Sequence, residues 1–548
     1  MILDLTITIQ PNEESKKNLI EKKLRAALTE VLKQGKIEIP AQDFDFKFVK
    51  KSIDARHGIQ KFILRYKAFT KNELEKLERK IVWKNADTSC GAKKVLIIGS
   101  GSAGLFAALR FLENGIQPVI IERGKSTSER KRDIAQISTR GIVDGDSNYC
   151  FGEGGAGTFS DGKLFTRSTK RGDVEKILRI FCEFGADEKI LTDSHAHIGT
   201  DRLPKIVNAM REKIISLGGE IYFGMRCVDF LIENFSGEKI IKGIRAVQVE
   251  SNEEKEFFGD AVLLATGHSA CDIYEQIAKI SGESLEAKTF ALGVRVEHPR
   301  TLIDKIQFHG KSDSNLGAAE YRLTSQVEGR GVYTFCMCPG GFVVPSATES
   351  EQIVLNGMSC AKRNSPWSNS AIVVETRPED IPQKFFEQAE EAGAAALASL
   401  YFRRWIEHET FMHGEPPYQK APAQLLKDFL RGKPSRDFPK VSYTPGIVSS
   451  RLDEWLPVQI ASRLKEGIKE FDKKMRGFIC EEAVLLAIET RTSTPVRILR
   501  NRETFECAGI SRLYPCGEGS GYSGGIVSSA MDGENAAQAA LRKLLRCE

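Results

Sequence analysis

The chain has 548 residues, of which 41% are hydrophobic and 28% are charged, and its formal net charge is +5. This length exceeds what one hydrophobic core usually supports, so we expect two or three domains. The small basic excess does not indicate a nucleic-acid partner. No apolar run reaches the roughly 18 residues of a membrane-spanning helix, and no export signal opens the sequence. The twelve scattered cysteines are typical of reduced thiols, so we expect a cytoplasmic protein.

Residues 1–88 are predicted to form a separate small α+β domain. Apolar and polar residues alternate in three strand-like segments, and between the first two apolar residues recur at helical spacing. These segments are 3–9, 13–34 (helical), 44–53 and 60–69. Their order, β-α-β-β, is typical of a ferredoxin-like sandwich. The polar stretch 84–93 is the expected linker.

Residues 93–124 carry a dinucleotide-binding pattern. An apolar run leads into Gly99, Gly101 and Gly104 at the G-x-G-x-x-G spacing, and a helix is predicted directly after them. Gly99 permits a tight turn, Gly101 lets the backbone approach a pyrophosphate, and Gly104 allows the helix to pack closely on the strand. The free N–H groups at the helix start, near Ser102, suit phosphates.

Glu122 lies eighteen residues after Gly104, at the end of the next predicted strand, and Arg123 follows it. A carboxylate here can accept hydrogen bonds from both ribose hydroxyls and disfavours a 2′-phosphate. We therefore expect the ligand to contain an adenosine diphosphate with a free ribose. A glycine-rich turn without a ligand is the alternative.

Two further glycine-rich segments favour FAD over NAD. The loop 151–164 holds four glycines within six residues, which would let a flat isoalloxazine ring lie against bare backbone; an ordinary flexible loop is the alternative. In 513–546 a strand runs into a glycine loop and then a helix, whose dipole would stabilise the charge on reduced flavin. The residues of these two segments that we expect to contact the cofactor are Gly154, Gly155, Gly157, Ser160, Gly517, Glu518, Gly524, Gly525 and Ile526; outside them we expect Val228, Thr266 and Gly267 to contact it.

The sequence resembles a known family almost end to end. The first glycine fingerprint, ATG at 265–267 and the C-terminal glycine loop are similar to the glutathione-reductase-like FAD superfamily. Longer motifs resemble the bacterial FAD-dependent dehydrogenases (NAD(P)/FAD-dependent oxidoreductases) within it, a family without a settled substrate. These motifs are SIDAR (52–56), FGEGGAGTFSDGKL (151–164), FALGVRVEHP (290–299), TFCMCPGG (334–341), NGMS (356–359) and RTSTPVRILR (491–500).

The resemblance implies an α/β fold with a Rossmann-like FAD-binding domain of the glutathione-reductase type. That domain would comprise residues 89–285 and 486–548. An inserted α+β domain, 286–485, would cover the flavin and build the substrate pocket. Short strands with glycine and proline turns are predicted at 290–375, and a helix at 383–405.

Cys336 and Cys338 are the first candidates for chemistry. They stand one residue apart in TFCMCPGG, where they could form a flavin-linked thiol or a strained disulfide of high potential. Two strand cysteines on one face, without a redox role, are the alternative. No second Cys or His pair stands at ligand spacing, so we expect no metal site.

Arginines are the second group of candidates. Arg295 and Glu297 share one face of a predicted strand, and Arg491 and Arg497 precede the C-terminal flavin segment. An arginine there could hold a substrate carboxylate or stabilise reduced flavin; an interdomain salt bridge is the alternative for each. His195 matches an ordinary surface or core histidine.

These features predict an FAD-dependent dehydrogenase or reductase that transfers a hydride between flavin and a small or lipid-like organic molecule. NAD(P)H is a candidate transient reductant, although no second G-x-G-x-x-G unit indicates a domain for it. A flavoprotein that binds RNA through the basic run 47–57 is a second hypothesis, which the scarcity of stacking aromatics does not favour. The third hypothesis is that the flavin is structural and the protein is a scaffold without catalytic activity. The sequence gives no oligomeric state.

Overall fold

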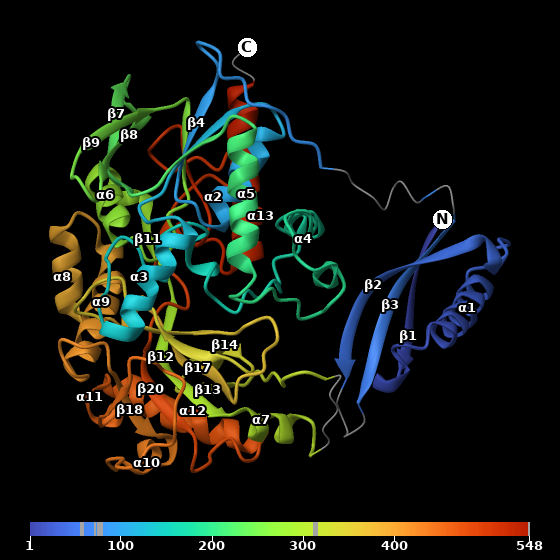
Figure 1. The fold of residues 1–548 in the computed structure, drawn as a ribbon. Helices are drawn as coiled ribbons and strands as arrows, with labels where there is room; N and C mark the ends of the chain where they lie inside the picture. The colour runs from blue at the N-terminus through green and yellow to red at the C-terminus, as the bar shows by residue number, and fades with distance from the viewer. Residues whose placement is uncertain (55–59, 71–72, 74–80, 311–315, 546–548) are drawn as a thin grey trace.

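The computed structural model describes residues 1–548 except 55–59, 71–72, 74–80, 311–315 and 546–548. The described chain forms a small N-terminal unit and a larger body (Figure 1). No described helix combines the length and apolarity that crossing a bilayer requires.

The N-terminal unit is a three-stranded antiparallel sheet with one long helix. Its elements, in chain order, are β1 (Ile2–Ile9), α1 (Lys17–Gln34), β2 (Phe44–Asp54) and β3 (Lys61–Thr70). The strand order is β1-β3-β2, and alternate residues of β1 pack against the apolar face of α1, as the sequence predicts. A ferredoxin-like fold has a second helix and a fourth strand, and the described residues of this unit contain neither.

A five-stranded parallel sheet forms the centre of the body. Its order is β22-β10-β4-β5-β6. The strands are β4 (Lys94–Ile98), β5 (Gln117–Ile121), β6 (Glu220–Tyr222), β10 (Ala261–Leu264) and β22 (Leu513–Pro515). The helices packed on one face are α2 (Ser102–Leu112), α4 (Val174–Glu183), α5 (Leu203–Ser216) and α13 (Ile526–Leu544).

An antiparallel meander covers the opposite face of this sheet. It comprises β7 (Met225–Phe235), β8 (Glu238–Gln248) and β9 (Glu254–Phe258). Val95 and Ile97 of β4 face the helices, whereas Leu96 and Ile98 face the meander side. Burial on both faces explains why the strand is a continuous apolar run rather than an alternating one.

A seven-stranded mixed sheet forms the second half of the body, in the order β13-β14-β17-β12-β20-β18-β19. Its strands are β12 (Phe290–Pro299), β13 (Thr324–Val327), β14 (Arg330–Cys338), β17 (Trp367–Thr376), β18 (Ala421–Leu425), β19 (Ile447–Ser449) and β20 (Val484–Glu489). Two short pairs flank it: β11 (Leu285–Ala287) with β21 (Val496–Ile498), and β15 (Phe342–Pro345) with β16 (Leu355–Met358).

Further helices surround the two sheets (Figure 1). They are α3 (Thr127–Arg140), α6 (Cys271–Ser281), α7 (Arg300–Gln307), α8 (Gln383–Glu391), α9 (Ala398–Met412), α10 (Leu426–Arg431), α11 (Leu452–Trp455) and α12 (Val458–Lys474). The single helix predicted at 383–405 is wrong. The chain breaks between α8 and α9 at Gly393, whose φ of +96° lies in the left-handed region.

The chain between β10 and β22 leaves the parallel sheet, builds the seven-stranded sheet and returns. β10 and β22 are therefore direct neighbours although about 250 residues separate them, 264 against 513. This path agrees with an inserted segment. The boundaries 89–285, 286–485 and 486–548 stay a prediction.

Candidate functional site

The first glycine turn joins β4 to α2. Gly99 has a φ of +101°, and a Cβ there would lie 2.5 Å from the carbonyl oxygen of Ala265. A Cβ on Gly104 would lie 2.0 Å from the carbonyl oxygen of Gly99, so the helix packs on the strand as the spacing predicts. Gly101 differs, because an added Cβ would meet only the Cα of Gly155, at 3.7 Å. Gly101 is therefore the open position of the turn, that is, the one where a side chain would project into free space.

Glu122 has a different local role from the predicted one. Its Oε2 accepts hydrogen bonds from the backbone N–H and the hydroxyl of Ser100, at 2.8 and 2.7 Å, and its Oε1 accepts from the backbone N–H groups of Gly124 and Gly152, at 2.9 and 3.0 Å. A carboxylate offers about four acceptor positions. Four protein donors therefore occupy the carboxylate that was expected to accept ribose hydroxyls, and Glu122 ties the first turn to the second glycine loop.

Arg123 and the first residues of β7 form the wall beside Glu122. The Arg123 guanidinium lies 4.1 Å from the ring centroid of Phe151 and pairs with Asp146 at 2.8 Å. Met225, Arg226 and Cys227 line the cavity described below. Val228 falls at the bulge where the β7–β8 register shifts and does not line the cavity, so its contact with the cofactor stays a prediction.

The second glycine loop lies directly over the first turn. Gly154 forms a bridge with Gly101 and donates its backbone N–H to the carbonyl of Ser100 at 3.0 Å. A Cβ on Gly155 would lie 3.0 Å from the Cα of Gly101. Backbone therefore meets backbone here, which only glycines permit.

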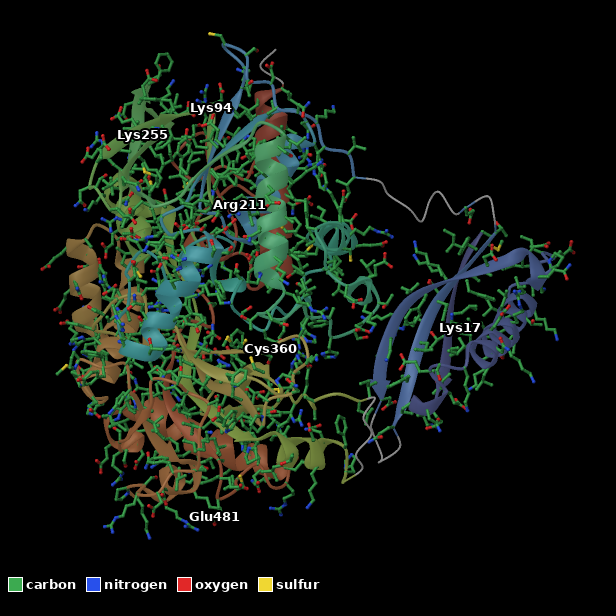
Figure 2. The ribbon with its side chains drawn as sticks, viewed as in Figure 1. Lys17, Lys94, Arg211, Lys255, Cys360 and Glu481 are labelled. Atoms are coloured by element: carbon green, nitrogen blue, oxygen red, sulfur yellow. The ribbon has the colours of Figure 1, made fainter. Side chains whose placement is uncertain are left out.

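Buried side chains hold this loop in place. The guanidinium of Arg130, on α3, donates to four carbonyls: those of Asn148 and Glu153 at 2.7 Å, Tyr149 at 2.8 Å and Gly152 at 3.2 Å. Arg211, on α5 (Figure 2), donates to the Glu153 carboxylate at 2.7 Å. Sequence reasoning missed both arginines, because neither stands in a motif.

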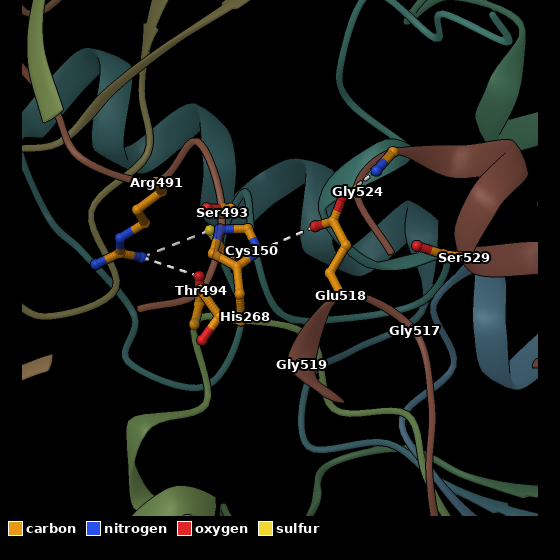
Figure 3. Close-up of polar contacts among 12 residues, drawn as sticks. Cys150, His268, Arg491, Ser493, Thr494, Gly517, Glu518, Gly519, Gly524 and Ser529 are labelled. Carbon is orange, nitrogen blue, oxygen red and sulfur yellow. Dashed lines mark hydrogen bonds and ion pairs between the residues drawn. The ribbon is translucent and has the colours of Figure 1, made fainter. Parts of the chain in front are cut away.

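The third glycine segment joins β22 to α13 and faces the end of β10. The Glu518 carboxylate lies 3.0 Å from Nδ1 of His268 and also accepts the backbone N–H of Gly525 (Figure 3). Burial opposes ionisation, but the His268 contact keeps the pKa of Glu518 below its usual value. A Cβ on Gly267, Gly524 or Gly525 would meet nothing within 4 Å.

The three glycine segments enclose one cavity of about 960 Å³. The open space beside Gly267, Gly524 and Gly525, and the open position at Gly101, form a cradle that side chains would fill. These features fit an extended dinucleotide. The predicted cofactor residues that line the cavity are Gly99, Gly101, Ser102, Glu122, Arg123, Gly154, Gly155, Gly157, Ser160, Thr266, Gly267, Gly517, Glu518, Gly524, Gly525 and Ile526.

The cavity continues to the edge of the seven-stranded sheet. Aromatic and charged side chains replace glycines in this part, which we call the sheet end. Its aromatic residues are Phe165, Tyr321, Tyr333 and Phe335, and its charged or ionisable residues are Asp161, Lys163, Arg167, His195, Glu320, Arg322 and Glu489. His195 is exposed, as a surface histidine is, and it also lines the cavity, where its Nδ1 lies 3.0 Å from the Glu320 carboxylate.

Of the catalytic candidates, Cys336 and Arg491 line this cavity. Arg491 is buried and pairs with Glu407 of α9 at 3.0 Å (Figure 3 shows the arginine directed toward Cys150). Arg403, also on α9, is fully buried and donates to the carbonyl of His268 at 3.3 Å. The buried ion pair of Arg491 therefore fixes the cavity wall behind His268. Arg403 and Glu407 stand in no sequence motif, so they could not be predicted.

Arg295, Arg497 and Cys338 do not line the cavity. Arg295 is fully buried behind it and pairs at 2.9 Å with Glu489 on the neighbouring strand. Arg497 is partly exposed and pairs at 2.6 Å with Glu286, which favours the salt-bridge alternative; a catalytic role for it stays a prediction. Successive residues of a β-strand point to opposite faces, so Arg497 points away from the interior in which Val496 and Ile498 are buried.

Glu489 is a cavity residue that sequence reasoning missed. It is the last residue of β20, and its carboxyl is fully buried. Burial raises the pKa of Glu489 to about 7, against the opposing effect of Arg295. The sheet end therefore contains a carboxyl that can be protonated near neutral pH. In the described ranges, no three His, Cys, Asp or Glu side chains come together as metal ligands would.

Two family models match the chain. One, described as FAD-dependent protein, C-terminal domain-like, matches residues 289–492; the other, described as FAD binding domain, matches residues 92–140. The second is a different FAD family from the predicted glutathione-reductase type, so that finer placement stays a prediction.

Individual relatives were also found. An uncharacterized protein of Clostridium beijerinckii is 40% identical over 453 residues, which are 82% of this chain and 80% of that protein. Among solved structures, THI4 of Thermovibrio ammonificans (15% identity, 35% of this chain and 63% of that one) gives a TM-score of 0.23. A geranylgeranyl bacteriochlorophyll reductase-like protein of Thermoplasma acidophilum (11%, 83% and 80%) gives 0.35. At these scores neither structure bears on this chain's function. The chain belongs to the FAD-dependent protein family of its Clostridium relative, and its cofactor is FAD.

Proposed function

We propose that this protein is an FAD-dependent oxidoreductase whose flavin and organic substrate occupy the two ends of one cavity. The single observation that supports this proposal is the continuity of that cavity, from the glycine cradle to the aromatic and charged sheet end. Bound FAD would supply two-electron transfer. A cavity that only held a structural cofactor would need no second, differently lined end.

The glycine cradle would bind the cofactor through backbone. The N-terminus of α2 at Ser102 offers N–H groups to the pyrophosphate. The N-terminus of α13 at Ile526 would face the flavin ring, where its dipole favours negative charge. The parallel sheet with its meander supports the finer proposal of a glutathione-reductase-type domain, and a dehydrogenase is one direction of the proposed reaction.

The sheet end supports a substrate that combines an apolar or aromatic part with an anionic group. Phe165, Tyr333 and Phe335 provide apolar surface. Arg167 and Arg322 line the same region, and neither forms an ion pair with another described residue. Unpaired arginines are suited to hold a carboxylate or phosphate.

Glu489 would move the proton that accompanies electron transfer. Its raised pKa, about 7, allows the carboxyl to donate or accept a proton near neutral pH. Arg295 fixes its orientation from behind the cavity wall. The fully buried position keeps bulk water away from this proton.

The test is the visible spectrum of the purified protein under anaerobic conditions. We expect a flavin spectrum that NADH, NADPH or an aryl-substituted 2-hydroxy acid, whose α-C–H can donate a hydride, bleaches, with no response to the corresponding amide. In Arg167→Gln/Arg322→Gln the KM for the acid should rise at least tenfold, which is about 1.4 kcal/mol, with kcat little changed. Arg476→Gln, at an exposed arginine outside the cavity, is the matched control. A flavin that no donor or acceptor alters would contradict the proposal.

A further inference from the structure

We infer that Cys336 and Cys338 form a redox-active dithiol that exchanges electrons with FAD and with a small disulfide substrate. The inference rests on the proposed function, because it requires a flavin that takes part in electron transfer. It also narrows the substrate class at the sheet end to disulfides or thiols that carry an anionic group.

The backbone around the two cysteines departs from a regular strand. Phe335 pairs with Ala371 and Cys338 pairs with Asn369, so β14 uses one residue more than β17 over this span. Cys336 has a φ of +43°, in the left-handed region that residues with a side chain seldom adopt. Such outliers persist only where the surroundings enforce them, and they concentrate at functional sites.

Two buried cations hold this bulge. The ammonium of Lys163 donates to the carbonyl of Met337, and Arg295 donates through Nη2 to the carbonyl of Cys336 at 2.8 Å. The Cys338 thiol lies 3.4 Å from that same carbonyl. Lys163 belongs to the second glycine loop, 151–164, so a segment that lines the glycine cradle also supports the cysteine pair directly.

The two thiols are adjacent but unequal. Both are free, and the Cys338 thiol is directed at the backbone of Cys336. Cys336 lines the cavity together with Glu489 and Thr492, whereas Cys338 lies behind it, fully buried. The side chain of Cys338 lowers the pKa of the Cys336 thiol, burial opposes this, and the charges of Lys163 and Arg295 lower the pKa further. The pKa of Cys338 is raised.

This asymmetry is what thiol–disulfide exchange requires. An accessible thiolate attacks a substrate disulfide and releases one substrate thiol; the second thiol then attacks Cys336, releases the other substrate thiol and closes an intrachain disulfide. To regenerate the pair, the S–S bond breaks and accepts two electrons and two protons from reduced FAD, which is oxidised. The same steps in reverse would oxidise substrate thiols.

Peptide mapping tests the dithiol without any need for activity. Trypsin should release residues 331–362 as one peptide, which contains Cys336, Cys338 and Cys360 (Figure 2 labels the last). After treatment of the native protein with dithiobis(nitrobenzoate) and removal of the reagent, we expect this peptide to contain a Cys336–Cys338 disulfide, with Cys360 either alkylated or capped by thionitrobenzoate. After reduction the peptide should take up three alkyl groups. Three alkyl groups in the oxidised sample, or an alkylated Cys336, would overturn the inference.

A reductive titration tests the exchange with FAD. The oxidised wild-type protein should take up four electrons per flavin, whereas Cys336→Ser and Cys338→Ser should take up two; Cys360→Ser is the matched control and should take up four. Equal uptake by wild type and Cys336→Ser would refute the exchange with FAD. A protein that holds no FAD would refute the proposed function instead, and the peptide map would still report on the dithiol.

Lys163 is a positioning residue in this scheme. The charged and titratable groups that act on Cys336 are Lys163, Arg295, Asp161, Cys338 and Glu489. In Lys163→Met the pH midpoint for alkylation of Cys336 should rise by about one unit, and Lys163→Arg should restore it in part. An unchanged pH midpoint in Lys163→Met would show that Lys163 does not influence the Cys336 thiol.

Discussion

The glycine cradle and the sheet end of the cavity are built in opposite ways. In the cradle, backbone approaches backbone: Gly154 bridges to Gly101, and Gly524 and Gly525 leave open space. At the sheet end, side chains from distant segments converge, such as Lys163 and Glu489. The cradle depends on glycines, which have no side chains, whereas the sheet end depends on which charged side chains come together. Substitutions should therefore act by occlusion in the cradle and by loss of charge or hydrogen bonds elsewhere.

The largest expected effect is from Gly101→Val. The added side chain would project into the cavity, because only Gly155 lies near the new Cβ. We expect the purified variant to retain almost no FAD, measured as flavin absorbance per polypeptide, while its far-UV circular dichroism stays unchanged. Gly145→Ala, where the nearest atom would lie at an ordinary 3.7 Å, should retain FAD fully. A yellow Gly101→Val protein would show that the cradle does not hold the cofactor.

Arg130→Met should have the next largest effect. The guanidinium satisfies four carbonyls of the second loop, and unsatisfied buried acceptors are destabilising, so we expect a loss of about 3 kcal/mol in the free energy of unfolding. Denaturant unfolding measures this. Arg132→Met, at an exposed arginine of the same helix, should change it by less than about 0.5 kcal/mol. Equal effects of the two variants would mean that the loop does not depend on Arg130.

Glu489→Gln tests the sheet end through pH. Because the pKa of Glu489 is raised from 4.5 to about 7, the folded state holds its proton more tightly than the unfolded state. The stability that this provides is fully present below pH 4.5 and is lost as pH rises through about 7. The free energy of unfolding of wild type relative to Glu489→Gln should therefore fall by up to about 3 kcal/mol over this range. A difference that does not vary with pH would indicate a permanently ionised Glu489.

Arg497→Ala should have the smallest effect. Its ion pair with Glu286 is partly exposed, and such pairs contribute under about 1 kcal/mol. We expect flavin content and the anaerobic spectrum to equal those of wild type, with a change in melting temperature of at most a few degrees. An altered flavin spectrum would show that Arg497 acts on the flavin.

The comparison of the two ends also explains what could be predicted from sequence. Glycine spacing after an apolar strand is local, so Gly99, Gly101 and Gly104 and the cofactor class could be identified, and FAD is confirmed by the family matches. The elements of the N-terminal unit were likewise predictable from short-range periodicity. SIDAR (52–56) lies partly outside the described residues, and RNA binding by the run 47–57 stays a prediction. In that run, Lys51 pairs with Glu14.

The other residues could not be found because their partners are remote in sequence. Glu489 matters only because Arg295, some 190 residues earlier, pairs with it; Arg130 matters because of the carbonyls that the fold brings to it. Val228 lies where the β7–β8 register shifts, between Cys227 and Asp229, and such a shift depends on the paired strand rather than on the local sequence. The position of a residue along a strand predicts the face of the sheet on which its side chain lies only where the register is regular.

The adjacency of β10 and β22 has a consequence for synthesis. Every residue of the seven-stranded sheet leaves the ribosome before β22 and α13 do, yet β22 completes the central sheet, and the segment between β22 and α13 supplies Gly517, Glu518 and Gly525 to the cradle. The cradle therefore cannot close during translation of the preceding 500 residues. A nascent or truncated chain that lacks α13 would remain colourless, so flavin content reports on completion of the chain.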